Sequence, residues 1–342
     1  MKKTLSLALV LLCLCAFSKA EPTDPCGRVP FADPYVLLHE GVYYAYGTFR
    51  SNEGVGVAVS RDLKSWDFWQ GRAKDGFALH KDDSYGDKWF WAPEVYRIGN
   101  RFIMYYSAET HTCAAVADSP LGPFRQAEQA PLIADMGTID NSLFFDRDGK
   151  PWMVFVKLGN EVWITRMEDD CLRVKPGTRR EIVRAVEPWE VAAKGTHIAE
   201  GPFVIYEKGR YVLTYSVNDY RDPAYAVCYA TAESPEGPWT KCSSPILQRG
   251  FGLSGTGHHS LFKDREGRWR IVFHAHNGAT KDGIHPRCMY IADLLVGGTD
   301  GAPELRIGDT LTTCTVARDE FDNPPPANSP VVHADGAAPA VD

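Results

Sequence analysis

A repeat constrains the fold of this 342-residue chain more than any other feature of its sequence. Five segments each combine a small or polar leading residue, a short apolar run, a turn with Gly or Asn and an aromatic-rich run; they begin at Ala32, Ala92, Ile139, His197 and His258. Alternating small and apolar residues follow in several units and end in a Ser-Pro-x-Gly-Pro-aromatic turn or a related one, which is typical of a third strand and a turn into a fourth. Four strands in each of five units predict an all-β, five-bladed β-propeller.

Two other architectures fit the sequence less well. The terminal units of a solenoid would have the character of caps, and these units do not. Helical periodicity is nearly absent, and the pattern is compatible with a short helix only at Arg180–Trp189. We therefore expect a single propeller domain.

The leading residues of the five units differ in type, although the strands behind them repeat. They are Asp33, Ala92, Asp140, Glu200 and His258. The first strand of each propeller blade lines the central channel, so equivalent leading positions converge at one mouth of that channel. An Asp before Pro or Asn usually caps a turn, and a single His is usually a hydrogen-bonded core residue. Three acids and a histidine in register nevertheless favour an enzyme site, because a sugar-binding propeller without catalysis would repeat one aromatic and polar pocket on every blade.

The motifs around these residues resemble those of glycoside hydrolase family 43. They are Ala32-Asp33-Pro34, Trp91-Ala92-Pro93-Glu94, Ile139-Asp140-Asn141-Ser142, Glu200-Gly201-Pro202 and Gly255-Thr256-Gly257-His258. The resemblance covers about Val29 to Thr315. It implies a five-bladed propeller and inverting hydrolysis of pentose or galactose linkages. This sequence departs from the family in that we expect no appended β-sandwich after the propeller.

The resemblance also implies catalytic roles. Asp33 would be the general base, Glu200 the general acid, and Asp140 the residue that orients the acid and tunes its pKa. Inverting hydrolysis needs one ionised and one protonated carboxyl on opposite faces of the sugar. Burial and a neighbouring negative charge would keep Glu200 protonated, which is consistent with Asp140 in that role.

Further site residues follow from the same resemblance or from position. His258 matches the axial histidine that contacts a metal ion in many members, with calcium expected. Arg287, in the segment PRCMYIADL, loosely matches an arginine of the last blade near the sugar. We expect Trp91 and Phe251 at the rim as substrate-binding aromatic residues, although rim packing is an alternative for Trp91. His259 departs from the family pattern, in which Asn is common.

Composition and the two ends of the chain predict an exported protein. Residues 1–20 have the pattern of a secretory signal peptide, residues 21–318 would form the catalytic propeller, and the Pro- and Ala-rich residues 319–342 would be a flexible tail. Loss of Lys2, Lys3 and Lys19 takes the basic residues from 37 to 34 against 44 acidic ones, so the net charge falls from −7 to −10. We expect no nucleic-acid partner, no stable membrane insertion and a secreted or periplasmic monomer.

The cysteines and the longer segments complete the expectations. Seven cysteines follow the leader, so at least one thiol should be free, with one or two disulfides compatible with the rest. Residues 71–90 and 169–196 are long, and we expect them to wall the channel mouth into a pocket that releases one terminal sugar. The predicted activity is that of an exo-acting α-L-arabinofuranosidase; β-D-xylosidase, exo-β-galactosidase and a non-catalytic sugar-binding propeller are the alternatives.

Overall fold

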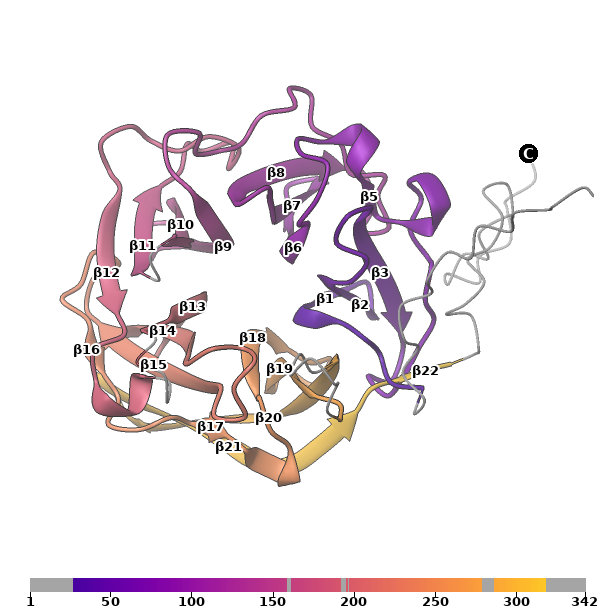
Figure 1. Cartoon of the computed structure of the whole chain (residues 1–342). Helices are drawn as coiled ribbons and strands as arrows, with labels where there is room; N and C mark the ends of the chain where they lie inside the picture. The colour runs from indigo at the N-terminus through magenta and orange to yellow at the C-terminus, as the bar shows by residue number, and fades with distance from the viewer. Residues whose placement is uncertain (1–26, 159–160, 192–194, 196, 279–285, 318–342) are drawn as a thin grey trace, which may run out of the picture.

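Five antiparallel sheets surround a central axis in the computed structural model of the chain (Figure 1). The structure describes residues 27–158, 161–191, 195, 197–278 and 286–317. The expected signal peptide and the tail after Arg318 lie outside these residues. The first strands of neighbouring sheets contact one another all the way round the axis, and this ring confirms the predicted five-bladed β-propeller.

Each blade is a meander whose strands run outward from the axis. Blade 1 has β1 (Ala32–His39), β2 (Val42–Thr48), β3 (Gly54–Ser60) and β5 (Leu79–His80). Blade 2 has β6 (Trp91–Ile98), β7 (Arg101–Ala108) and β8 (His111–Ala117), and blade 3 has β9 (Thr138–Phe145), β10 (Pro151–Lys157), β11 (Glu161–Arg166) and β12 (Arg180–Arg184). Blade 4 has β13 (Ala199–Glu207), β14 (Arg210–Val217), β15 (Ala226–Ala232), β16 (Thr240–Lys241) and β17 (Leu247–Gln248), and blade 5 has β18 (Gly257–Lys263), β19 (Trp269–His276), β20 (Arg287–Thr299) and β21 (Ala302–Thr313).

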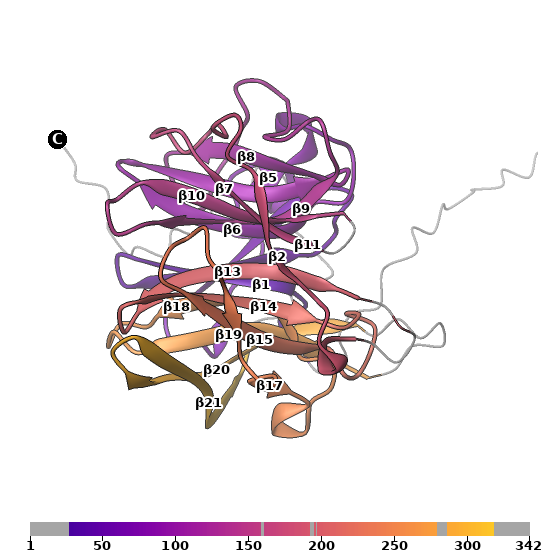
Figure 2. The same cartoon turned by 90° about the vertical axis from the view of Figure 1, so that its left-hand side faces the viewer.

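The aromatic-rich runs form the second strands and fill the space between blades. Neighbouring sheets pack face to face (Figure 2). One aromatic side chain of each second strand is fully buried there: Tyr46, Tyr106, Phe155, Tyr215 and Phe273. Burial of side chains this large on both faces of each sheet is the main hydrophobic contribution to the fold.

The ring closes through the two ends of the described chain. Strand β22 (Thr315–Val316) pairs in parallel with β4 (Ser65–Trp66) at the outer edge of blade 1 (Figure 1). The segment before β1 lies against blade 5, where Val29 N–H donates to Cys314 O and Val29 O accepts from Met289 N–H. Residues from both ends therefore join the first blade to the last.

One expectation about the longer segments was wrong. Residues 180–184, where a helix was compatible with the pattern, form strand β12 on the edge of β11, and the only helical turn there is the 3-10 helix η3 (Pro188–Glu190). Residues 71–90 contribute the outer strand β5 and the 3-10 helices η1 (Lys74–Gly76) and η2 (Lys81–Asp83). Parts of these segments complete blades 1 and 3, and the expectation that the segments wall the channel mouth into a pocket stays a prediction.

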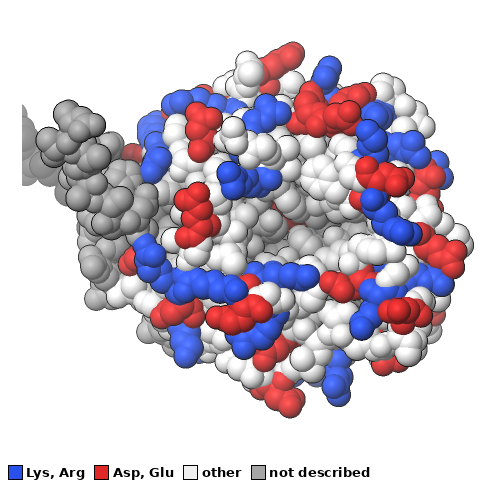
Figure 3. Space-filling view, turned by 180° about the vertical axis from the view of Figure 1, so that it is seen from behind, with Lys and Arg blue, Asp and Glu red and all other residues white. Residues whose placement is uncertain are grey.

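Surface charge and cysteines bear on the expected partners. Acidic and basic side chains are interspersed around the central hollow on the face seen from behind (Figure 3). Among the described residues, no helix has the length and apolar character needed to cross a bilayer. All six cysteines in the described part of the chain are free.

Candidate active site

A β-bulge at the start of every first strand builds the mouth of the channel. The register between first and second strands shifts after the first residue pair in blades 1, 2 and 5 and after the second pair in blades 3 and 4. The residue inside each shift has a positive φ: Asp33 (51°), Ala92 (44°), Asp140 (55°), Gly201 (54°) and His258 (38°). Bulges of this kind re-aim side chains, and here they turn the leading residues toward the axis.

The bulges correct the predicted alignment of the fourth blade. Gly201, not Glu200, is in register with Asp33, Asp140 and His258. Glu200 lies one residue earlier, at the position that Trp91 has in blade 2. Glycine suits the bulge because it adopts a positive φ readily. A Cβ at Gly201 would also lie 3.1 Å from the His258 ring, so glycine here lets the imidazole pack beside Glu200.

Hydrogen bonds link each bulge to the preceding blade around the axis. In four blades the bulge N–H donates to a polar side chain near the end of the neighbouring second strand: Ala92 N to Thr48 Oγ1 (3.0 Å), Asp140 N to Ser107 Oγ (3.0 Å), His258 N to Ser216 Oγ (2.8 Å) and Asp33 N to His274 Nδ1 (3.1 Å). Blade 3 has the apolar Val156 at the matching position, opposite Ile139. The Asp140 carboxylate replaces that acceptor and takes the N–H of Gly201 at 3.0 Å.

Asp33 is an ionised carboxylate in a cationic setting. Thr48 Oγ1 donates to its Oδ2 at 2.6 Å, and Arg287 Nη1 donates to its Oδ1 at 2.9 Å. His258 Nδ1 lies 3.4 Å from Oδ1. Burial alone would raise the pKa of Asp33, but Arg287 and His258 outweigh it and hold the pKa well below 3.8.

Glu200 has the opposite electrostatic setting. Tyr225 donates its hydroxyl to Oε1 of Glu200 at 2.7 Å. Burial, followed by the negative charge of Asp140, raises the pKa of Glu200 to about 7. Gly257 makes room for the tyrosine, because a Cβ there would lie 2.3 Å from the Tyr225 ring. Tyr225 in turn stacks on His274, with ring centroids 5.5 Å apart.

Asp140 and His258 interact electrostatically with both Asp33 and Glu200. Burial and the charge of Asp33 raise the pKa of Asp140, although His258 and the Gly201 N–H oppose the shift. Burial would lower the pKa of His258, but Asp33, Asp140 and Glu200 raise it above its ordinary value. The imidazole Nδ1 lies 4.0 Å from Asp140 Oδ2. The cluster thus contains one ionised carboxylate, Asp33, one carboxyl near half protonation at neutral pH, Glu200, and a histidine with a raised pKa beside Asp33 and Asp140.

Comparison with known proteins decides the family. The model of glycosyl hydrolases family 43 matches residues 22–290. This chain belongs to glycosyl hydrolase family 43. The family 43 chain is 39% identical to a solved structure titled endo-1,4-beta-xylanase from Bacteroides thetaiotaomicron, with a TM-score of 0.78, covering 85% of this chain and 99% of that one.

Other relatives of the family 43 chain differ in their named substrates. A solved thermostable family-43 glycoside hydrolase is 34% identical, with a TM-score of 0.71, over 84% of this chain and 96% of that one. A beta-D-galactofuranosidase of Aspergillus niger is 27% identical over 273 residues, which are 71% of this chain and 73% of that protein. Enzymes of this family hydrolyse glycosidic bonds with inversion, and the two relatives named for a substrate, the xylanase and the galactofuranosidase, differ in their sugar.

Of the remaining predicted site residues of this family 43 enzyme, Arg287 and Trp91 lie at the mouth of the channel. Arg287 is part of the carboxylate cluster, and its guanidinium also lies 4.6 Å from the Tyr220 ring centroid. Trp91 is the first residue of β6, and its ring stacks on that of Trp89 with the ring centroids 5.6 Å apart. Phe251 is 37% exposed on the 3-10 helix η4 (Gly250–Gly252), in the loop before β18.

The described residues around His258 do not form a set of side chains that could coordinate the expected metal ion directly. Among the described residues, no group of three or more His, Cys, Asp or Glu side chains is arranged to hold a metal. The Nδ1 atom of His258 faces two carboxylates as an ion-pair partner. The described residues therefore do not fit direct coordination of calcium, and no chemical step below uses a metal.

Sequence reasoning missed several residues of the site. Thr48 and His274 could have been found by aligning the ends of the second strands, where Ser107 and Ser216 take the same place. Tyr225 carries no such signal, because it precedes β15 and reaches Glu200 from the loop.

Glu94 was quoted in a motif without a role. Tyr96 donates its hydroxyl to the Glu94 carboxyl, and Leu143 N–H donates to the same tyrosine oxygen at 3.2 Å. Burial raises the pKa of Glu94 to about 8, against the hydrogen bonds of Tyr96 and Ser142. The channel therefore holds a second carboxyl, besides Glu200, whose pKa is raised to near or above neutral pH.

Proposed function

We propose that this family 43 enzyme hydrolyses glycosidic bonds with Asp33 as general base and Glu200 as general acid. The observation that carries the assignment is the difference in pKa between two carboxyls of one cluster. The pKa of Asp33 is well below 3.8 and that of Glu200 is raised to about 7. Environments that separate two pKa values in this way assign the base and the acid of a glycosidase.

The geometry around each carboxyl supports a single displacement. Asp33 takes a proton from water as that water attacks the anomeric carbon, and Arg287 and Thr48 hold its carboxylate in place. Glu200 gives its proton to the leaving oxygen from Oε2, because Oε1 accepts from Tyr225. Each turnover leaves a proton on Asp33 and a charge on Glu200, and exchange with solvent restores both.

The substrate is a pentose-containing plant polysaccharide or oligosaccharide, with terminal α-L-arabinofuranose released by exo action. Support comes from relatives named for arabinose linkages, among them an extracellular exo-alpha-(1->5)-L-arabinofuranosidase of Cellvibrio japonicus, 21% identical over 312 residues. A second candidate is hydrolysis of β-1,4-xylosyl linkages. The 39% identical structure titled endo-1,4-beta-xylanase favours it.

A panel of aryl glycosides tests the sugar. Aryl α-L-arabinofuranoside should give the highest kcat/KM among arabinofuranoside, β-D-xyloside, β-galactoside and β-galactofuranoside. A β-xyloside as the best substrate would establish the second candidate. Mixed oligosaccharides released early from arabinan or xylan, without monosaccharide, would contradict exo action. Absence of hydrolysis of every glycoside tested would favour the alternative of a non-catalytic, sugar-binding propeller.

Product stereochemistry and two variants test the roles. Proton NMR should show a first-formed sugar with the anomeric configuration inverted. Asp33→Ala should abolish hydrolysis of every leaving group, whereas Glu200→Ala should slow poor leaving groups by about 10²–10⁴-fold and activated aryl glycosides far less. Retention of configuration would require a covalent intermediate and would remove Asp33 from the role of base.

A calcium ion near His258 stays a separate prediction, now through bound water because no direct cage is described. Chelation followed by elemental analysis should remove a bound ion and lower the activity or the melting temperature. Full activity and unchanged stability in a metal-free sample would contradict it.

A further inference from the structure

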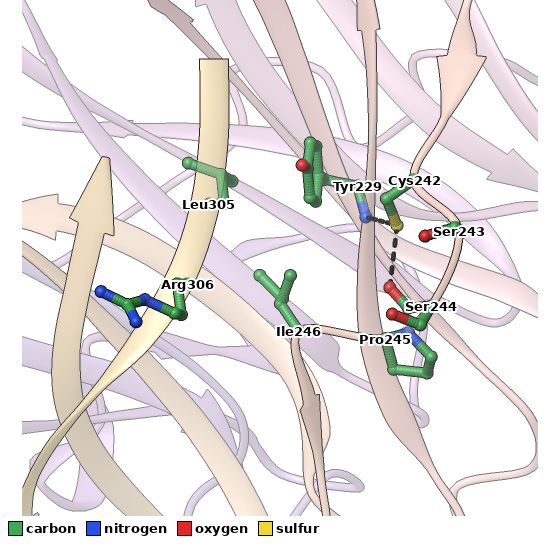
Figure 4. Close-up of a pocket in the computed structure, with 8 residues that line it drawn as sticks. All are labelled: Tyr229, Cys242, Ser243, Ser244, Pro245, Ile246, Leu305 and Arg306. Carbon is green, nitrogen blue, oxygen red and sulfur yellow. Dashed lines mark hydrogen bonds between the residues drawn. The ribbon is translucent and has the colours of Figure 1, made fainter. Parts of the chain in front are cut away.

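Cys242 lines a hollow on the outer edge of blade 4, away from the carboxylate cluster. The hollow has a volume of about 300 Å³, and Tyr229, Pro245, Ile246 and Leu305 also line it (Figure 4). Cys242 follows β16 directly and is half-buried. A reagent in this hollow would therefore meet a thiol.

The sulfur of Cys242 is turned into the edge of β15. The Cys242 N–H donates to Tyr229 O at 2.9 Å, as in a regular ladder. The return bond does not go to the Cys242 carbonyl. Instead, the Tyr229 N–H donates to Cys242 Sγ at 3.4 Å (Figure 4). The side chain therefore lies near the plane of the sheet and not on the face where Tyr229 points.

In this position the sulfur of Cys242 lies close to the side chain of Cys228. The Tyr229 nitrogen is bonded to the carbonyl carbon of Cys228, so a sulfur 3.4 Å from that nitrogen lies within a few ångströms of the Cys228 side chain. Residues on neighbouring strands that are offset by one position have Cα atoms within the range that a disulfide spans. Cys228 is fully buried on β15, opposite Tyr215 of β14.

The two thiols differ in reactivity. Hydrogen bonds from the Cys228 thiol and from the Tyr229 N–H lower the pKa of Cys242 to about 7, although burial opposes the shift. Burial raises the pKa of Cys228 far above its ordinary value. Cys242 Sγ also lies 3.1 Å from Ser244 O, to which the thiol donates when it is protonated (Figure 4). A cysteine of lowered pKa that lines a hollow, with a protonated thiol behind it, has the arrangement of an attacking and a resolving cysteine.

We propose that Cys242 and Cys228 form a redox-active pair that reacts with low-molecular-weight disulfides and closes a disulfide between β15 and the segment after β16. The Cys242 thiolate attacks a disulfide RSSR, forms a mixed disulfide and releases RS⁻. Cys228 then attacks the Cys242 sulfur, releases a second RS⁻, and its proton passes to a released thiolate. Two thiols of the protein are oxidised and RSSR is reduced to two RSH. An exported protein would meet such oxidising conditions.

Glutathione disulfide is the probe for this pair. The reduced full-length protein is incubated with it, the remaining thiols are alkylated, and peptides are analysed by mass spectrometry. The expected result is loss of two hydrogens and a linked pair of peptides that contain Cys228 and Cys242. The melting temperature of the oxidised form should be several degrees above that of the reduced form.

Three variants separate the steps. Cys228→Ala should keep a glutathione adduct on Cys242, because the resolving thiol is gone. Cys242→Ala should give neither adduct nor link at these positions. Cys113→Ala, which removes a buried thiol of blade 2, should form the link as the unaltered protein does. The proposal is overturned if both thiols stay alkylatable in the unaltered protein, if either links to another cysteine, or if Cys228→Ala takes no adduct on Cys242.

Discussion

Tyr225 and Asp140 act on one carboxyl with opposite sign. The hydroxyl of Tyr225 donates to Glu200 and favours its ionised form, whereas the charge of Asp140 favours its protonated form. Activity that needs protonated Glu200 should decline as pH rises through about 7. The position of this alkaline limit is therefore a direct measure of both neighbours.

Asp140→Asn should move the alkaline limit of kcat/KM to lower pH. Loss of the like charge lowers the pKa of Glu200, by about one unit. Asparagine keeps an oxygen that can accept the Gly201 N–H, so the melting temperature should change little while the rate falls. Asp148→Asn makes the same charge change at an exposed site beyond β9 and is the matched control. An alkaline limit that does not move would show that Asp140 does not tune the acid.

Tyr225→Phe should move the same limit to higher pH. The lost hydroxyl stabilised the ionised form of Glu200, and a hydrogen bond to a charged group is worth about 1.5–3 kcal/mol, or about one to two units in the pKa of Glu200. The pH profile of kcat/KM measures it. A shift in the same direction as Asp140→Asn would mean that the tyrosine acts on packing rather than on the charge of Glu200.

At the scale of elements, the repeated strands were predictable and the bulges were not. Ala32 to Thr48 and the four similar runs carry enough alternation and turn residues to specify hairpins. Gly201 rather than Glu200 is in register because of the β-bulge, in which two residues of β13 lie opposite one residue of β14. Alternation in the sequence does not specify that opposition. The link from Tyr225 to Glu200 also depends on packing in three dimensions, so no local pattern predicts it.

Gly257 tests how strictly an element positions the acid. Gly257→Ala places a Cβ 2.3 Å from the Tyr225 ring, which must move away and weaken its bond to Glu200. We expect a loss of about 1–3 kcal/mol in the free energy of unfolding together with a fall in kcat. Gly297→Ala is the control, because its Cβ would approach no atom nearer than 3.9 Å. Denaturant unfolding and steady-state kinetics measure both; full activity of Gly257→Ala would contradict the packing role.

At the scale of the whole molecule, closure of the ring depends on the last described residues. Truncation after Arg318 keeps β22 and should leave activity and melting temperature nearly unchanged. Truncation after Thr313 removes Cys314, which is fully buried, and the pairing of Thr315 and Val316 with β4. The melting temperature should then fall by several degrees or more. Thermal unfolding of both forms checks this, and equal stability would show that the parallel pairing contributes nothing to closure.

The same closure sets an order of events for a chain that is still being made. Blade 1 can form its hairpins early, but its outer edge stays open until residue 316 has left the ribosome or the export channel. The contact that completes the fold joins residues about 250 positions apart, and contacts so distant in sequence form slowly. During that interval the exposed edge at β4 can pair with other chains. Recovery of this protein should therefore depend on how quickly the last residues arrive and on how dilute the newly made chains are.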